Sequence, residues 1–372
     1  MKKIDFLDLK KINASNKQEY TEIFQKVIDD GWYILGKNVS EFETAYAEFS
    51  NTKFSIGLAN GLDALILSLK ALDIGPGDEV IVPSNTYIAS WLAVSNVGAT
   101  VVPVEPRFDT CNIDPALIES AITSSTKAVM AVNLYGQSAE LIEIKLICDK
   151  HNLYLIEDNA QAQGATCEGF MTGSVGIINA TSFYPGKNLG ALGDAGAITT
   201  DSEILADKVK TLRNYGSKVK YYNEVQGYNS RLDELHAALL MFKLQKLNDE
   251  NAFRQICAGI YYEQLQAIEG LTLPVLAESC TSNHHIYLVR TKKRNELQKY
   301  LADHNIGTMI HYPLPPHMQS AYNALGFKKG DFPIAEEIAN TCLSLPMGPH
   351  LAIEDISLVS ERIQDFFKIN TN

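Results

Sequence analysis

The chain has 372 residues, 46% hydrophobic and 20% charged, which is typical of a folded protein of two or three domains and excludes a disordered one. Its 32 Lys and Arg residues against 44 Asp and Glu residues give a net charge of −12, which excludes long-range attraction to nucleic acid or to an anionic membrane. Any anionic ligand must therefore be held by a local pocket.

The amino-terminal segment and the cysteines bear on location and on metal binding. The first residues, MKKIDFLDLKKINAS, are too polar for a secretory signal, and no later stretch has 18 apolar residues without a charge, so we expect a cytoplasmic protein. The cysteines are far apart and form no C-x-x-C pair, which predicts neither a metal site nor a disulfide framework. We expect small core residues at Cys111, Cys148, Cys167, Cys257, Cys280 and Cys342.

The first predicted element is an amphipathic helix. Ser15 and Gln18 have the spacing of a capping box, the apolar residues from Tyr20 to Ile28 lie on one helical face, and Gly31 ends the helix. We expect this helix to pack on the core.

Residues 60–158 predict alternating helices and strands. NGLDALILSLKALDIGPGDEV contains an apolar helical stripe, a turn and the start of a strand. Apolar runs follow at ATVVPVE, KAVMAVNLYG and LYLIED, separated by helix-length segments such as TYIASWLAVSNV and one opened by Asp114-Pro115. This alternation predicts an α/β fold in which helices cover a mainly parallel sheet.

The pattern changes after about residue 250. RLDELHAALLMFKLQKL predicts a long helix that serves as a hinge, HHIYLVR a strand, and RNELQKYLADHN and EDISLVSERIQDFF two helices. We therefore expect a large domain over residues 1–250 and a smaller α+β domain over residues 251–372.

An acid and a lysine follow two of the predicted strands. In LYLIEDNAQAQGA the apolar run stops at Glu157 and Asp158, and ligands of open α/β sheets bind where parallel strands end. Lys187, in TSFYPGKNLGALGDAGA, follows a second predicted strand, so the sheet could bring it to Asp158. The alternatives are that Asp158 caps a following helix and that Lys187 is a solvated loop lysine.

A carboxylate and a lysine placed in this way suit pyridoxal phosphate. Its aldehyde forms a Schiff base with an amine, and its ring withdraws electrons only while the ring nitrogen is protonated. A carboxylate in contact favours the protonated nitrogen by ~1–3 pKa units, and a partly desolvated lysine loses its proton more readily.

The cofactor's phosphate needs an anion site. Asn60-Gly61-Leu62-Asp63 opens a helix after FSIGLA, so its free N–H groups could bind an anion, and Ser182 could add a hydroxyl. The alternative for Gly61 is an ordinary tight turn. Tyr87 could stack on a ring or could belong to the core.

Two nucleotide-binding motifs fail on their spacing. GALGDAG has glycines at every third position and no strand-to-helix unit after it, which argues against a dinucleotide site. In PGKN, Asn188 stands where a P-loop requires Ser or Thr.

Several segments resemble the DegT/DnrJ/EryC1/StrS family of pyridoxal-phosphate-dependent nucleotide-sugar aminotransferases. They run in family order from about residue 30 to 350 and include NGLDAL, PGDEVIVPSNTYIAS, EDNAQAQGA, SFYPGKNLGALGDAGA, GYNSRLDELHAA and IHYPLPPHMQSAY. The resemblance implies fold type I, the aspartate aminotransferase-like fold. It also implies pyridoxal 5′-phosphate, present as pyridoxamine 5′-phosphate during turnover, and a homodimer with shared active sites.

The same resemblance assigns the cofactor contacts. Lys187 matches the Schiff-base lysine and Asp158 the partner of the pyridinium nitrogen. The other matches are Gln161 beside the ring, Tyr87 stacked on it, Gly61, Leu62 and Ser182 at the phosphate, and Asn229 reaching the phosphate of the other subunit. Many members have Thr in place of Leu62, so only its backbone N–H could serve here. Asn159 replaces a common Ala, which the sequence does not explain.

The resemblance also indicates the reaction. Lys187 argues against the branch of dehydratases that have histidine there, and FYPGKNLGALGDAGA resembles members that aminate C3 of a dTDP-linked 3-keto-6-deoxyhexose with L-glutamate. Members acting on C4 more often carry FHPxKxxTTGEGG. The residues implied at the hexose are Tyr184, His311 and Tyr312, and those toward the nucleotide are Lys218, Lys220, Tyr221 and Arg231. Without the resemblance, His311 would be interpreted as a core histidine.

Two other functions stay open at this point. One is amination at C4 or C2 by the same chemistry, and the other is a non-catalytic binding protein that kept the fold. The regulators of the second kind need an appended basic DNA-reading domain, which this chain lacks. The sequence leaves open whether the hexose is galacto or gluco. It also leaves open whether the product enters cell-surface polysaccharide (O-antigen or S-layer) or antibiotic sugar synthesis.

Overall fold

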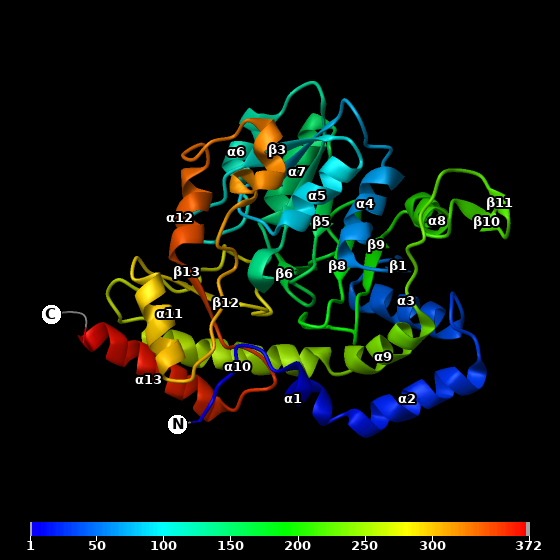
Figure 1. The fold of residues 1–372 in the computed structure, drawn as a ribbon. Helices are drawn as coiled ribbons and strands as arrows, with labels where there is room; N and C mark the ends of the chain where they lie inside the picture. Colours follow the sequence, from blue (N-terminus) through cyan, green and yellow to red (C-terminus); the bar gives the residue numbers. More distant parts are fainter. Residues whose placement is uncertain (1, 370–372) are drawn as a thin grey trace.

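A seven-stranded sheet forms the centre of the computed structural model, which describes residues 2–369 (Figure 1). In spatial order its strands are β1 (Phe54–Leu58), β9 (Gly196–Thr200), β8 (Ile178–Ser182), β5 (Tyr154–Asp158), β4 (Thr126–Val132), β2 (Glu79–Pro83) and β3 (Thr100–Val104). β9 runs antiparallel to β1 and β8, and all other neighbours are parallel. The mainly parallel sheet expected from the sequence is therefore confirmed.

Helices cover both faces of this sheet. One face packs against α4 (Gly61–Ala71), α5 (Ile88–Asn96) and α8 (Glu203–Leu212), and the other against α6 (Pro115–Ala121) and α7 (Leu141–His151). Buried Val, Ile, Leu and Ala residues fill both interfaces, because strands buried on two sides need apolar residues throughout.

The alternation along β5 decides which way its acids point. Ile156 belongs to the core on the α4–α5 face, and Leu155 belongs to the core on the α6–α7 face. Successive side chains of a strand point to opposite faces. Asp158 therefore shares the α4–α5 face with Ile156, whereas Glu157 shares the other face with Leu155.

The remaining long elements lie at the two ends of the chain. The amino-terminal helices are α1 (Leu9–Ala14), α2 (Lys17–Asp30) and α3 (Lys37–Phe49). The later ones are α9 (Glu234–Leu244), α10 (Leu247–Leu265), α11 (Arg294–Asp303), α12 (Pro333–Thr341) and α13 (Ile353–Ile369). Figure 1 shows α9 and α10 one after the other along the base of the molecule, with α13 packed beside α10.

Three strand pairs lie outside the main sheet. They are β6 (Thr166–Cys167) with β7 (Phe170–Met171), β10 (Ser217–Val219) with β11 (Tyr222–Asn223), and β12 (Tyr287–Arg290) with β13 (Cys342–Leu345). In Figure 1 the β10–β11 hairpin projects from the body at the end of α8.

The first predicted helix forms, but its start was predicted wrongly. It is α2, and Gly31 ends it in the left-handed conformation with φ of 64°. Ser15 already follows α1, so the residue before α2 is Asn16, which makes no side-chain capping bond. The helix is also less buried than expected, because Ile28 is 58% exposed.

The long helix predicted over residues 231–247 is two helices. α9 ends at Leu244, and α10 begins at Leu247 and continues to Leu265, well beyond the predicted end of the helix. The predicted strand at 284–290 and the two later helices form as β12, α11 and α13. The division into two domains near residue 250 stays a prediction.

Within residues 2–369, none of the helices is both long enough and apolar enough to cross a bilayer.

Candidate active site

Asp158 and Lys187 follow neighbouring parallel strands of the sheet. Asp158 is the last residue of β5 and is paired in register with Ala180 of β8. Lys187 lies in the turn after β8, where its N–H donates to the carbonyl of Tyr184 at 2.8 Å. The two strands therefore bring both residues to one edge of the sheet, as the sequence predicted.

Asp158 is buried and only partly satisfied by the chain. Its Oδ2 accepts from the Ser90 hydroxyl at 2.8 Å, and its Oδ1 accepts from the N–H of Ala160 at 3.2 Å. Burial raises the pKa of this carboxyl, while these donors and the charge of Lys187 act to lower it. Residues 159–165 contain no helix, so the alternative that Asp158 caps a following helix is wrong.

Lys187 has the environment of a reactive amine. Its side chain is partly buried, and burial lowers the pKa of Lys187 to about 8, although the nearby carboxylate of Asp158 raises it. A lysine in water keeps a pKa near 10.4. The alternative of a freely solvated loop lysine is therefore wrong, and a substantial share of neutral amine is present near neutral pH.

Gln161 joins the loop after β5 to two tyrosines. Its Oε1 accepts from the N–H of Tyr135 at 2.6 Å, and its Nε2 donates to the hydroxyl of Tyr312 at 3.1 Å. The ring of Tyr312 lies 5.1 Å from the ring of Tyr87, tilted by 38°. Tyr87 is 52% exposed, so the alternative that it belongs to the core is wrong.

The start of α4 lies against Ser182. Asn60 caps this helix, because its side chain accepts from the N–H of Asp63 at 2.8 Å. The N–H groups of Gly61 and Leu62, in the first turn, have no acceptor within the helix. A Cβ added to Gly61 would lie 2.6 Å from the Cβ of Ser182, so glycine is required for this close approach. The free N–H groups and the hydroxyl together form a cradle suited to an anion.

The sequence-predicted hexose residues divide into buried and exposed groups. His311 bonds through Nδ1 to the Ser344 hydroxyl at 2.9 Å, and burial and the charge of Lys187 lower its pKa to about 4. His311 is therefore neutral at physiological pH. Tyr312 is tied to Gln161, whereas Tyr184 is 56% exposed.

The residues expected toward the nucleotide lie in or near the β10–β11 hairpin. Lys218 lies in β10, Lys220 lies over the ring of Tyr221 at 5.2 Å, and Arg231 donates to Asn214 Oδ1 at 3.0 Å. No hydrogen bond, ion pair or ring contact joins this group to Lys187 or Asp158 within residues 2–369. Asn229 is also exposed, where its backbone pairs with Asn214. One chain therefore does not bring these residues to the lysine.

A histidine near Lys187, His285, was not predicted from the sequence. His285 Nδ1 bonds to Asn188 Oδ1 at 3.0 Å, and burial, followed by the charge of Lys187, lowers the pKa of His285 far below its usual value. Its position at the start of the predicted strand HHIYLVR was the available signal.

The structure also explains Asn159. Its Nδ2 donates to the carbonyl of Thr172 at 3.1 Å, and its Oδ1 accepts from Asn133 at 3.2 Å. An alanine could make neither bond, so the asparagine belongs to a buried polar network behind the sheet edge.

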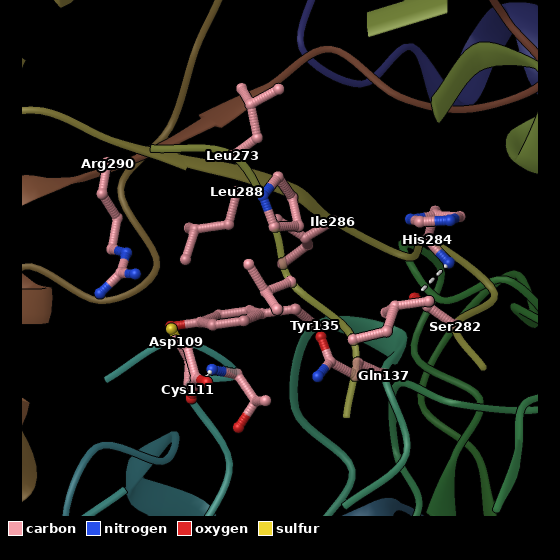
Figure 2. A pocket seen from close by; sticks show the side chains of 14 residues that line it. Asp109, Cys111, Tyr135, Gln137, Leu273, Ser282, His284, Ile286, Leu288 and Arg290 are labelled. Carbon is pink, nitrogen blue, oxygen red and sulfur yellow. Dashed lines mark hydrogen bonds between the residues drawn. The ribbon is translucent and has the colours of Figure 1, made fainter. Parts of the chain in front are cut away.

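A separate cavity adjoins Tyr135, whose N–H bonds to Gln161 (Figure 2). Leu273, Ile286 and Leu288 form apolar walls, and Arg290 lies at one end, with its guanidinium 3.9 Å from the ring centre of Phe108. Lys187 and Asp158 do not line this cavity. The cavity is therefore not the site built by β5 and β8.

The chain is similar to known aminotransferases. Residues 14–364 match the DegT/DnrJ/EryC1/StrS aminotransferase family. The chain is 50% identical to a dTDP-3-amino-3,6-dideoxy-alpha-D-galactopyranose transaminase of Aneurinibacillus thermoaerophilus, covering 98% of this chain and 99% of the relative. It is 45% identical to a dTDP-3-amino-3,4,6-trideoxy-alpha-D-glucose transaminase of Streptomyces venezuelae, covering 94% and 92%.

A third relative carries a different description. The erythromycin biosynthesis sensory transduction protein EryC1 of Saccharopolyspora erythraea is 47% identical, with 94% of this chain and 96% of the relative covered.

Two solved structures share the fold. DesV of S. venezuelae, in complex with a ketimine intermediate, matches with a TM-score of 0.97 at 44% identity, covering 98% of this chain and 99% of DesV. NtdA of Bacillus subtilis, with bound cofactor PMP, matches with a TM-score of 0.92 at 29% identity, covering 99% and 86%. The fold and family expected from the sequence are therefore confirmed.

Proposed function

The chain belongs to the DegT/DnrJ/EryC1/StrS aminotransferase family, and we propose that it transfers the amino group of L-glutamate to C3 of a dTDP-linked 3-keto-6-deoxyhexose. It is an aminotransferase. The observation that carries the choice of substrate is the 50% identity, over nearly the full length of both chains, to a transaminase named for a dTDP-3-amino-3,6-dideoxyhexose. The product is a dTDP-3-amino-3,6-dideoxyhexose, which would enter cell-surface polysaccharide or antibiotic sugar synthesis.

The donor set of the site fits pyridoxal phosphate. Lys187 supplies an amine of lowered pKa, and Asp158 supplies a buried carboxylate with acceptor capacity left over. The residues that would hold the rest of the cofactor are Gln161, Tyr87, Gly61, Leu62 and Ser182. The close approach of Gly61 to Ser182 brings the first N–H groups of α4 near the Ser182 hydroxyl, which supports binding of the phosphate there. When bound, pyridoxal phosphate acts as an electron sink and carries the amino group, as pyridoxamine phosphate, between the two halves of the reaction.

Lys187 holds and moves the proton in this proposal. With the pKa of Lys187 at about 8, roughly one amine in ten is neutral at pH 7, compared with fewer than about one in a thousand at an ordinary lysine. A neutral Nζ can accept a proton from the α-carbon of L-glutamate and later deliver one to C3 of the sugar. Delivery from a single position on the loop after β8 fixes the face of the sugar that is protonated.

Two neutral histidines keep the surroundings of this amine free of added positive charge. The lowered pKa values of His311 and His285 mean that neither is protonated at pH 7. His311, fixed by Ser344, can then bond to a sugar hydroxyl without repelling a protonated Lys187. Tyr312 and Tyr184 would also contact the hexose.

A second copy of the chain would complete the site. Asn229, Lys220, Tyr221 and Arg231 do not contact Lys187 within one chain, and Tyr221 is 85% exposed. We assign Asn229 to the phosphate of the partner's cofactor and the hairpin to the nucleotide. With a net charge of −12, local cations such as Lys218, Lys220 and Arg231 would offset the charge of the pyrophosphate.

The alternative left open by the sequence is a non-catalytic binding protein, and one relative, EryC1, is described as a sensory transduction protein. An aminotransferase and a binding protein predict opposite results for the half-reaction with L-glutamate alone. An aminotransferase converts glutamate to 2-oxoglutarate in an amount equal to its own bound cofactor, whereas a binding protein produces none.

The test supplies the purified protein with glutamate and with the galacto and gluco epimers of dTDP-3-keto-6-deoxyhexose. We expect new amine on C3, located by mass spectrometry and NMR, with one epimer converted faster. No turnover of either 3-keto epimer would contradict the assignment to C3.

A further inference from the structure

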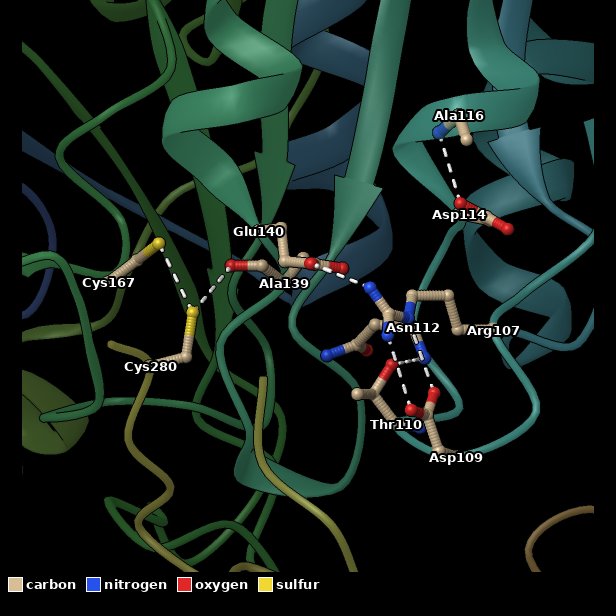
Figure 3. Close-up of polar contacts among 10 residues, drawn as sticks. All are labelled: Arg107, Asp109, Thr110, Asn112, Asp114, Ala116, Ala139, Glu140, Cys167 and Cys280. Carbon is tan, nitrogen blue, oxygen red and sulfur yellow. Dashed lines mark hydrogen bonds and ion pairs between the residues drawn. The ribbon is translucent and has the colours of Figure 1, made fainter. Parts of the chain in front are cut away.

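Two cysteines far apart in sequence, Cys167 and Cys280, point toward each other (Figure 3). The sulfur atoms of Cys167 and Cys280 are 3.2 Å apart, and both residues are buried. The sequence predicted isolated core cysteines, and burial is confirmed for all six, but the spacing gave no sign of this pair. Neither thiol touches the groups assigned to the transaminase reaction.

The backbone around the pair has the geometry that a disulfide needs. Cys167 and Cys280 are partners in an antiparallel bridge, flanked by the bonds from Glu168 N–H to Ser279 O and from Thr281 N–H to Thr166 O, each 2.8 Å. These flanking bonds make the cysteines a non-hydrogen-bonded pair, for which Cα atoms are about 4.5 Å apart. That separation lies within the range of about 4.4–6.8 Å found for disulfides.

Cys167 is the more nucleophilic of the two thiols. The Cys280 thiol donates to the Cys167 sulfur, and this bond lowers the pKa of Cys167 and raises that of Cys280. The N–H groups of Leu141 and Ile142, in the first turn of α7, lower the Cys167 pKa further. The N–H groups at a helix N-terminus stabilise the negative charge of a thiolate in this way.

The other four thiols lack such an environment. Burial raises the pKa values of Cys111, Cys148, Cys257 and Cys342, and none of them has a second cysteine sulfur within hydrogen-bonding distance. They therefore serve as internal controls for chemistry at Cys167.

We propose that Cys167 and Cys280 are an oxidisable pair that forms a reversible disulfide when the protein meets hydrogen peroxide. The Cys167 thiolate attacks one peroxide oxygen, the O–O bond breaks, and the departing hydroxide takes up the thiol's proton to become water, leaving a sulfenic acid. The Cys280 sulfur then attacks the Cys167 sulfur, the S–O bond breaks, and the leaving hydroxide takes the Cys280 proton. The two sulfurs together give two electrons, and one peroxide becomes two waters.

The cross-link would fasten the loop after β5 to the segment at residues 280–285, where His285 bonds to Asn188, next to Lys187. The loop after β5 carries Gln161 and Gln163. The side-chain amide of Asn283 donates to the backbone carbonyl of each, at 3.0 Å. A disulfide beside these bonds would close a loop with a sequence separation of 113. Closing a long loop restricts the unfolded chain, so the oxidised protein should melt several degrees higher.

The test uses the full-length reduced protein, treated with hydrogen peroxide, alkylated and mapped by mass spectrometry. We expect a peptide pair joined through Cys167 and Cys280, the other four cysteines alkylated, the higher melting temperature, and reversal of all changes by dithiothreitol. C280S should lose the cross-link and the rise in melting temperature, whereas C257S should keep both.

Three results would overturn the proposal. They are oxidation of Cys167 to the sulfinic acid without a cross-link, a cross-link between other cysteines, or an equal rise in melting temperature in folded C280S. Should C280S not fold, the intact mass of the wild-type protein decides, because a disulfide removes two hydrogens and dithiothreitol restores them.

Discussion

The two faces of β5 end in carboxylates with opposite roles. Glu157, on the α6–α7 face, accepts four hydrogen bonds, from the N–H groups of Gly173, Val175 and Gly176 and from the Asn133 amide. Asp158, on the α4–α5 face, accepts only from Ser90 and Ala160. A carboxylate has about four acceptor positions, so the chain saturates Glu157 and leaves capacity on Asp158.

This difference shows that burial alone does not mark a functional acid. Burial raises the pKa of both carboxyls. The two carboxyls differ in what lowers the pKa against this effect. At Glu157 it is hydrogen bonds from the chain, whereas at Asp158 the charge of Lys187 adds to the hydrogen bonds. Glu157 therefore organises the loop at residues 173–176, and Asp158 is available to a ligand.

The largest expected effect belongs to the lysine on the Asp158 face. K187A removes the amine whose charge acts on Asp158, so transamination should fall by roughly 10²–10⁴-fold or more. K243A is the matched control, because Lys243 is also buried with a lowered pKa, and it should retain activity within about ten-fold. Steady-state rates with glutamate and the keto-sugar measure the activity of both variants. Equal losses in the two variants would contradict the role of Lys187.

The second prediction exchanges the two acids for amides. In the proposed site, D158N would remove the charge that favours the protonated ring nitrogen of pyridoxal phosphate, so the loss of ~1–3 pKa units of stabilisation should lower kcat by roughly 10–10³-fold. E157Q places amide N–H groups against backbone N–H donors, so it should lower the free energy of unfolding by about 1–3 kcal/mol. Rates and thermal melts of both variants test this contrast.

The sign of the stability effect at Asp158 follows from its raised pKa. The folded chain loses stability as the pH rises through that pKa, because the buried carboxylate is disfavoured. Asparagine removes this loss, so cofactor-free D158N should be at least as stable as the wild-type protein at pH 7. If D158N were strongly destabilised and E157Q were unaffected, the structural role would belong to Asp158 and not to Glu157, which would contradict this assignment.

The third prediction concerns pH. Because burial lowers the pKa of Lys187 to about 8, the rate at which cofactor-free protein takes up pyridoxal phosphate should rise with pH and level off above about 8, rather than near 10.4. The Asp158 charge raises the Lys187 pKa, so the midpoint in D158N should lie lower than in the wild-type protein. Stopped-flow absorbance measures both midpoints. A midpoint unmoved by D158N would show that the two groups do not interact.

The smallest effect is expected where Gln161 meets Tyr312. Y312F removes one hydrogen bond of 3.1 Å, which is worth about 0.5–1.5 kcal/mol, so activity should fall by roughly two- to ten-fold. Y322F is the control, because it removes a similar bond to Ser95 away from the site and should leave activity unchanged. A loss with Y312F as large as that with K187A would give Tyr312 a direct part in the chemistry.

The sequence predicted the elements and the site residues that local patterns encode. Asp158 and Lys187 could be placed together because both follow predicted parallel strands. The different roles of Glu157 and Asp158 could not be predicted, because they depend on the loop at 173–176, whose N–H donors reach Glu157 only in the folded chain. His285 and the Cys167–Cys280 pair were missed for the same reason, since their partners lie about 100 residues away.

The most direct test of the Lys187 site is to reduce the holoenzyme with borohydride, which makes a carbon–nitrogen double bond between cofactor and lysine permanent, and to map the labelled peptide. We predict a single pyridoxyl group on Lys187, and no label in K187A. A label on Lys243 or another lysine, or no label in protein that still transaminates, would contradict the account.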